Sequence, residues 1–176
     1  MFVLDKEKNR IVKIKSKNFS DLGIRERENL QVWLENNPEA FGEELLFIQK
    51  EFEQFQGTKE RLDLLALDKK GNIVIIENKT DDSGKDVVWQ AVKYAAYCSE
   101  ISLKKSVSLY GEHLKKLNFN ENVAKERILE FLDIDSQEFD FKEDEILNQR
   151  IILVSKSFPK EVLSTVLWLY KYKIDI

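Results

Sequence analysis

The sequence predicts an α/β (α+β) fold in which helices flank a mixed central sheet. Three β-rich runs follow one another between residues 45 and 79, and helical patterns come before and after them. A fourth β-rich run, Arg150–Ser155, lies beyond two further helical segments. An order of helix, three strands, helix and strand is typical of a sheet packed between helices.

Composition narrows the class of protein. With 176 residues, 43% of them hydrophobic, the chain can bury a core without a metal or a disulfide. The net charge is only −4, so charge repulsion does not favour disorder. One cysteine, Cys98, excludes an intramolecular disulfide, and with a single histidine it cannot form a zinc cage. We expect a cytoplasmic protein without membrane contact, since no apolar run approaches the ~18 residues of a membrane span.

The N-terminal region should form a small appendage. Two short apolar runs, Met1–Leu4 and Ile11–Lys15, flank a charged turn and predict a β-hairpin within residues 1–19. Residues 20–176 are then expected to form the main domain. Its first helix should begin at Ser20–Asp21, continue to Leu34 and end before Asn37–Pro38.

The middle of the chain predicts three strands and a helix. The strands are expected at Leu45–Phe52, Arg61–Leu67 and Ile73–Lys79, and a turn with Gly71 joins the last two into a hairpin. A helix from about Lys85 to Ser99 should follow, because its apolar residues recur at helical spacing.

The remainder predicts a helical insertion and a return to the sheet. The insertion, about 103–145, should hold helices at 103–117 and 121–132 and then an acidic loop that covers the domain. A buried strand at 150–155, a helix at 160–172 and the start of a further strand at 174–176 are expected next. A chain that stops at a strand start suggests a truncated C-terminus.

Two central strands that are otherwise apolar carry ionisable residues. If Gly71 takes the left-handed position of a three-residue turn, Asp68 pairs with Asn72, and counting back places Asp63 opposite Glu77. Lys79 should share the face of Glu77, because side chains alternate along a strand. A two-residue turn would separate Asp63 and Glu77, and Gly71 favours the register that brings them together.

Two carboxylates that meet out of water need a cation between them. Mg²⁺ or Mn²⁺ prefers oxygen ligands, polarises a phosphate and lowers the pKa of a bound water. Lys79 could orient that water or stabilise charge at phosphorus, so Asp63, Glu77 and Lys79 indicate phosphodiester hydrolysis. On these residues alone, a solvated sheet edge or a simple ion pair remains the alternative.

The same residues resemble the PD-(D/E)XK nuclease superfamily in its RecB-like branch. Asp63 matches the motif aspartate, Glu77–Lys79 matches the glutamate-x-lysine element, and Gln90 and Tyr94 match the glutamine-x-x-x-tyrosine motif on the next helix. The resemblance covers roughly residues 28–97. It implies a restriction-endonuclease-like fold and a DNA-cleaving enzyme with a magnesium cofactor.

The resemblance also implies roles for further residues. Glu28 would be an auxiliary metal ligand, and the backbone carbonyl of Asn78 would be a ligand whatever its side chain. Gln90 and Tyr94 would hold Lys79 or the nucleic-acid backbone, with Lys93 beside them at the DNA. The chain departs from the pattern at Leu62, where the motif has proline, and at polar Asn78.

Two other functions remain open at this stage. The chain could be a catalytically inactive nuclease-fold module that binds nucleic acid for a larger protein. It could also be a structural or oligomerisation domain that pairs, as in a homodimer, through the helices between 103 and 132.

The remaining conspicuous residues predict packing or surface positions. We expect His113 to be a solvated surface residue, because no carboxylate pattern flanks it. Trp33, Trp89 and Trp168 lie in helical segments beside apolar residues and should pack in the core or at an interface.

Overall fold

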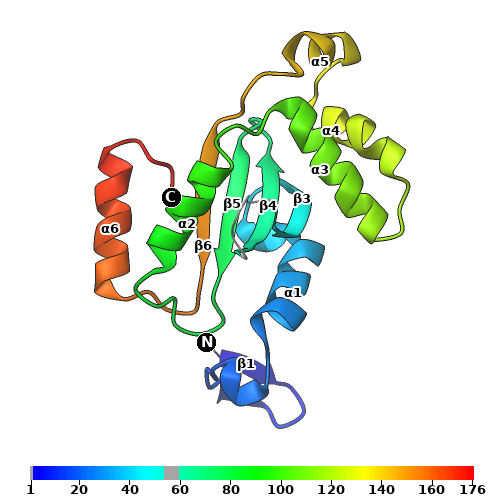
Figure 1. Cartoon of the computed structure of the whole chain (residues 1–176). Helices are drawn as coiled ribbons and strands as arrows, with labels where there is room; N and C mark the ends of the chain where they lie inside the picture. Colours follow the sequence, from blue (N-terminus) through cyan, green and yellow to red (C-terminus); the bar gives the residue numbers. More distant parts are fainter. Residues whose placement is uncertain (1, 54–59) are drawn as a thin grey trace.

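The computed structural model describes residues 2–53 and 60–176 and contains two separate sheets. A two-stranded hairpin lies at the N-terminus, and a four-stranded mixed sheet with helices on both faces forms the body of the protein (Figure 1). The predicted mixed α/β class is therefore confirmed. Within the described residues, every helix is too short or too polar to cross a bilayer.

The N-terminal hairpin consists of β1 (Phe2–Asp5) and β2 (Arg10–Lys13), which pair antiparallel from Phe2 opposite Lys13 to Asp5 opposite Arg10. This confirms the predicted hairpin, apart from Met1, which lies outside the described residues. Nearly all of its residues are exposed on both faces. Figure 1 shows the hairpin beyond one end of the main sheet, next to the end of β5.

The main sheet has the strand order β3-β4-β5-β6. Strands β3 (Leu45–Phe52), β4 (Leu62–Asp68) and β5 (Ile73–Asn78) are antiparallel, and β6 (Gln149–Val154) joins β5 in parallel. All four strands lie where the sequence predicts them. The expectation that the last is buried is wrong, because β6 forms the sheet edge and only Ile151 in it is buried.

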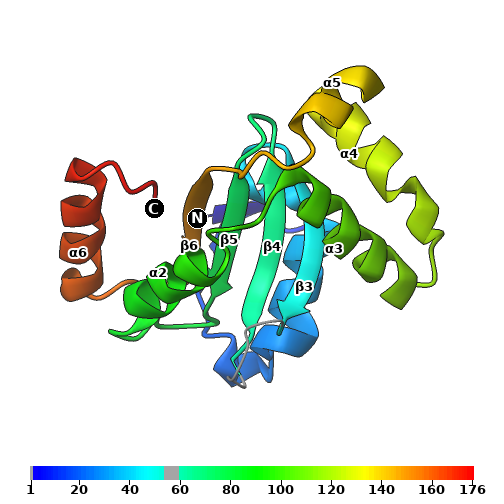
Figure 2. The same cartoon turned by 45° about the horizontal axis from the view of Figure 1, so that its top comes forward.

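The two faces of the sheet are covered by different helices. One apolar cluster joins Leu65 and Ile75 to α2 (Val87–Tyr97) and α3 (Leu103–Lys116), and a second joins the opposite face to Leu34 of α1 (Gln31–Asn36). Figure 1 and Figure 2 show α2 and α3 on one side of the strands and α1 towards the other. Every residue of β4 and β5 is consequently buried.

The remaining helices follow the predicted positions with one exception. A short 3-10 helix, Glu121–Val123, leads into α4 (Ala124–Leu132), and α6 (Lys160–Lys171) follows β6. The acidic segment predicted as a loop instead contains α5 (Ser136–Lys142). Asp135 caps that helix, because its carboxylate accepts a hydrogen bond of 2.8 Å from the Gln137 backbone N–H.

The predicted helix from Ser20 to Leu34 is broken into three pieces. A 3-10 turn at Ser20–Leu22 ends at Gly23, a π-helical turn at Glu26–Leu30 follows, and only then does α1 begin. Helix α1 ends before Asn37 as predicted, and a 3-10 helix, Pro38–Phe41, comes next. Gly23 has φ +67°, which ends the first turn because a helix cannot continue through a left-handed residue.

Residues 174–176 do not start a new strand. The Asp175 carbonyl accepts a hydrogen bond of 2.7 Å from the Ile151 N–H, but no strand forms there. This hydrogen bond and the ion pair between Asp175 and Arg150 hold the segment against β6.

His113 differs from its predicted environment, and of the two environments predicted for the tryptophans the structure excludes the core. His113 is only 4% exposed, and its Nε2 lies 3.0 Å from Oε1 of Glu35, because α3 packs along β3 beside the end of α1. The three tryptophans are not core residues, and their exposed fractions are 44% for Trp33, 70% for Trp89 and 56% for Trp168. Helical spacing identified apolar segments but not which helix face the sheet covers.

Candidate functional site

The β4–β5 turn determines which residues meet at the other end of the hairpin. Gly71 has φ +80°, its N–H donates to the Asp68 carbonyl at 3.0 Å, and the Asp68 N–H donates to the Asn72 carbonyl at 3.1 Å. The ladder then runs from Leu67 opposite Ile73 to Leu64 opposite Ile76. One step further along this register places residue 63 opposite residue 77, as the sequence predicts.

Asp63 is buried at the start of β4 and accepts two hydrogen bonds. Its Oδ1 accepts from the Gln31 side chain at 2.8 Å, and its Oδ2 accepts from the Asn78 backbone N–H at 2.8 Å. Gln31 is completely buried in α1. Sequence analysis missed it, although a glutamine between Leu30 and the apolar residues of a helix was a signal for a buried polar partner.

Glu77 is fully buried near the end of β5 and forms an ion pair. Its Oε1 accepts from Lys79 Nζ at 2.7 Å, whereas its Oε2 is buried without a hydrogen-bond partner in the described part of the chain. Lys79 also lies 3.8 Å from Oε1 of Glu26, and its side chain is 25% exposed. Lys79 and Glu26, whose side chain is 29% exposed, are therefore the parts of this cluster that reach solvent.

The acidic groups share an environment that disfavours their charge. Burial raises the pKa of Asp63 to about 7, the charge of Glu77 contributes to the rise, and the Asn78 N–H opposes it. Burial also raises the pKa of Glu77, against the opposing effect of Lys79. Burial alone would lower the pKa of Lys79, but its hydrogen bond to Glu77 and the negative charges of the neighbouring acids together outweigh burial and raise the pKa. The cluster thus has more acidic groups than the lysine can neutralise.

The structure does not bring Glu28 to this cluster. Its side chain is 62% exposed and pairs with Arg25 at 2.9 Å. Glu26 lies beside Lys79 instead, and its charge acts on both Asp63 and Glu77. The resemblance implied an auxiliary acid at Glu28, whereas the structure has Glu26 next to Lys79.

Gln90 and Tyr94 lie together on α2, where the Gln90 amide donates to the Tyr94 hydroxyl at 3.3 Å. Tyr94 is 2% exposed, and burial raises its pKa, as does the charge of Glu77. The Tyr94 ring thus lies inside the protein, and its contact with nucleic acid stays a prediction. Lys93 forms an ion pair with Glu60.

Asn78 occupies an unusual position between the two acids. It is fully buried, and neither polar atom of its side chain has a hydrogen-bond partner among the described residues. Its backbone N–H instead orients Asp63. Hydrogen bonding to β6 continues to the next residue, since the Lys79 N–H donates to the Val154 carbonyl at 2.7 Å.

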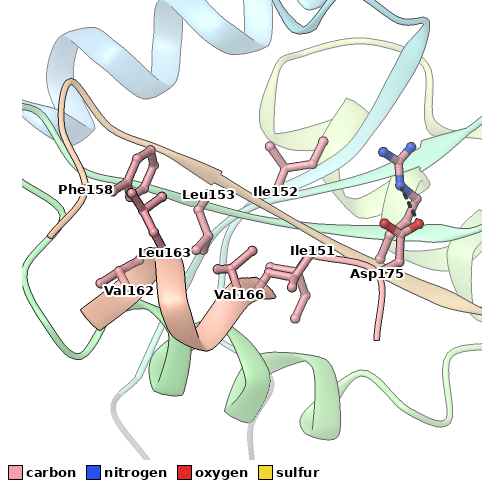
Figure 3. Close-up of a pocket in the computed structure, with 10 residues that line it drawn as sticks. Ile151, Ile152, Leu153, Phe158, Val162, Leu163, Val166 and Asp175 are labelled. Atoms are coloured by element: carbon pink, nitrogen blue, oxygen red, sulfur yellow. Dashed lines mark ion pairs between the residues drawn. The ribbon is translucent and has the colours of Figure 1, made fainter. Parts of the chain in front are cut away.

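Away from this cluster, a hollow of about 360 Å³ lies between β6 and α6 (Figure 3). Its wall is mainly apolar, with Leu153 and Phe158 at one end and the Arg150–Asp175 ion pair at the other. None of the sequence-predicted site residues lines it. The chemistry-bearing groups are thus gathered at Asp63, Glu77 and Lys79.

Comparisons with models of protein families, with curated proteins and with solved structures found no match to this chain. In the described residues, no three His, Cys, Asp or Glu side chains form a metal-binding group. The protein donors at the cluster are thus two facing carboxylates, with Glu26 on the far side of the lysine.

Proposed function

We propose that this protein is a metal-dependent nuclease that hydrolyses DNA phosphodiester bonds. Asp63 and Glu77 would hold Mg²⁺ or Mn²⁺, and Lys79 would act beside them. The observation that supports this most is the buried acid pair with one amine, in which burial and Glu77 raise the pKa of Asp63 to about 7. Such perturbed acids are typical of functional sites.

The acidic cluster fits a hard divalent cation. Oε2 of Glu77 is buried without a partner in the described structure, and each oxygen of Asp63 accepts only one hydrogen bond. Oxygen donors with excess negative charge are what Mg²⁺ and Mn²⁺ prefer. The Asn78 carbonyl remains a proposed ligand, and Glu26 takes the auxiliary role that the sequence assigned to Glu28.

The chain's own groups have distinct roles in this proposal. A bound ion would polarise the phosphate and lower the pKa of a water. Lys79 stays protonated, because Glu77 raises its pKa, and its ammonium stabilises charge that develops on the phosphate or orients the water. Gln31 positions Asp63, and the Gln90–Tyr94 pair packs α2 beside Glu77.

The fold is consistent with the resemblance to PD-(D/E)XK nucleases. Helical turns, three antiparallel strands, helix α2 and a returning strand follow in the order that the motifs implied. Asp63 and the Glu77–Lys79 element lie at one end of the same hairpin.

Glu77→Gln and Lys79→Met are the decisive variants. Each should lower Mn²⁺-dependent cleavage of single-stranded, duplex or branched DNA by on the order of 100-fold or more. The matched control is Asp68→Asn, a buried carboxylate at the far end of the same strand as Asp63. Folding of each variant is checked by circular dichroism at the assay temperature. Cleavage that persists in Glu77→Gln would exclude the assigned site.

An inactive nucleic-acid-binding module is the second candidate, and one observation favours it. Asp63 and Glu77 are 5% and 0% exposed, and Lys79 already occupies one oxygen of Glu77. Isothermal titration with Mg²⁺ and Mn²⁺ separates the two proposals. A nuclease should bind the ion in a way that Asp63→Asn abolishes, whereas the inactive module should bind DNA equally well in EDTA.

A further inference from the structure

The positive charge of the chain is concentrated at its N-terminus. Residues 1–19 contain six basic and two acidic side chains, a formal charge of +4. The whole chain has −4, so residues 20–176 sum to −8. A polyanion would therefore be repelled by the body of the protein and attracted to the N-terminal segment.

The lysines of this segment are available to a ligand. Lys13, Lys15 and Lys17 are exposed, and none has a side-chain ion pair among the residues that the structure describes. In contrast, Lys79 and Lys93 of the body are paired with glutamates. Phosphate contacts by the N-terminal lysines would break no existing ion pair.

One face of the hairpin is also apolar and uncovered. In the observed register Phe2, Leu4 and Ile11 point to the same side as Lys13, because side chains alternate along each strand. Their exposed fractions are 63%, 70% and 69%. Unpaired bases can stack on Phe2 and make apolar contacts with Leu4 and Ile11 while lysines contact the phosphates, whereas a duplex keeps its base faces stacked inside.

The base of the hairpin is fixed close to the candidate site. Asp81, beyond β5, accepts from the backbone N–H groups of Phe19 at 2.7 Å and Ser20 at 3.1 Å. Lys156 donates to the Lys17 carbonyl at 3.3 Å. These contacts hold residues 16–20 against the ends of β5 and β6.

A cavity of about 420 Å³ lies at this junction. Lys79 of the candidate site, Lys17 of the N-terminal segment and Lys156 after β6 all line it. The remaining lining residues are Ser16, Phe19, Leu30, Val154 and Ser155. Three lysines from three separate segments thus border one hollow, which the segment after the hairpin shares with the lysine of the candidate site.

We propose that the N-terminal hairpin and residues 14–17 bind a single-stranded polynucleotide and lead its backbone past this cavity to Lys79. Bases lie on Phe2, Leu4 and Ile11, and phosphates contact Lys13, Lys15 and Lys17. The inference rests on the proposed function for the destination of the strand, but the binding itself requires no cleavage.

The charge of the surface is tested by fluorescence anisotropy with a labelled oligothymidylate of about 20 nucleotides in EDTA. The triple variant Lys13→Glu/Lys15→Glu/Lys17→Glu should weaken binding at least about tenfold. It should also make the slope of log binding constant against log salt concentration shallower by about 2, since each lost phosphate contact removes ~0.7 from that slope. The matched control, Lys116→Glu/Lys160→Glu/Lys171→Glu, changes the same charge on exposed helix positions and should bind much as the native chain does. Equal effects of the two triple variants would overturn the proposal.

The apolar face is tested separately. Phe2→Ser/Leu4→Ser/Ile11→Ser should weaken binding of the single strand by about tenfold and leave the weaker duplex binding nearly unchanged. Tighter binding of duplex than of single strand by the native chain would contradict the proposal. So would binding to vesicles with anionic lipid in the absence of oligonucleotide binding.

These outcomes are distinguishable from failure of the proposed function. If the native chain does not cleave but the hairpin variants lose binding, the nuclease assignment fails and the binding surface stands. If Glu77→Gln abolishes cleavage but the hairpin variants bind normally, the nuclease assignment stands and this inference fails.

Discussion

Asp63 and Asp68 lie near the two ends of the same strand and are buried to the same extent, with 5% and 4% exposed. Their partners differ. Asp68 accepts from the backbone N–H groups of Lys70 and Asn72, from the Asn72 side chain at 2.9 Å and from Arg150 at 3.2 Å. From the residues that the structure describes, Asp63 accepts two hydrogen bonds, and its charged neighbour on the adjacent strand is another acid.

The pKa values of the two aspartates move in opposite directions. Burial acts to raise the pKa of Asp68, but the hydrogen bonds from Asn72 and Arg150 outweigh it and lower the pKa. At Asp63 burial and Glu77 prevail, and its pKa rises to about 7. Two carboxylates with little exposed surface therefore differ: Asp68 lies nearer the surface with several donors, whereas Asp63 lies deeper in the protein with fewer donors and is strained. The strained acid is the one suited to binding a cation.

The largest expected effect is the pH dependence of Asp63→Asn. A carboxylate whose pKa is raised on folding binds its proton more tightly in the native state, so the native chain loses stability as pH rises from about 4 to 7. The full loss above pH 7 is roughly 4 kcal/mol, because each pKa unit corresponds to about 1.4 kcal/mol. The variant cannot titrate there, so its free energy of unfolding should exceed that of the native chain increasingly over this range.

Gln31 should allow this substitution without a new clash. Its Oε1 is buried without a partner within the described structure, so rotation of its amide would let it accept from the new amide nitrogen at position 63. Urea unfolding in EDTA at pH 4.5, 6 and 7.5 measures the difference. Parallel stability curves for the variant and the native chain would show that Asp63 is not strained.

Asp68→Asn should change the free energy of unfolding by less than Asp63→Asn, and should lower it. It removes a charged acceptor from Arg150 and the turn, so the free energy of unfolding at pH 7 should fall by about 2 kcal/mol. A lowered pKa contributes stability above the ordinary value near 4, and that contribution disappears as pH falls through the native pKa. The variant and the native chain should therefore converge as pH falls below the ordinary aspartate pKa near 4, as measured by urea unfolding. A deficit that is unchanged at acid pH would attribute the loss to packing rather than to charge.

The sequence was sufficient to predict this hairpin because the determinants are local. Gly71 defines the turn, the turn fixes the register, and the register brings residue 63 opposite residue 77. The partners from outside the hairpin were not predictable in this way. Gln31 reaches Asp63 only through the packing of α1 on the sheet.

A second group of predictions was wrong because it depended on irregular backbone or on contacts between elements far apart in sequence. The π-helical turn places Glu26 rather than Glu28 at Lys79, and no periodic pattern in the sequence reports such a turn. His113 was misjudged because its partner, Glu35, is distant in sequence and meets it only where α3 packs along β3. The edge position of β6 likewise depends on strand order, not on the composition of the strand.

The smallest predicted effect concerns the turn that sets the register. Gly71→Ala should cost about 1 kcal/mol, because φ +80° disfavours a Cβ although nothing lies within 4 Å of the place that a Cβ would occupy. Gly111→Ala in α3 is the control, since its Cβ would make only ordinary contacts of 3.5 Å or more and alanine favours a helix by up to about 1 kcal/mol. Urea unfolding should therefore give a lower free energy of unfolding for Gly71→Ala and a higher one for Gly111→Ala than for the native chain. Gly71→Asn should recover part of the lost stability, because asparagine tolerates the left-handed region. If Gly71→Ala and Gly71→Asn lower the free energy of unfolding equally, something other than the φ angle of residue 71 holds Asp63 opposite Glu77.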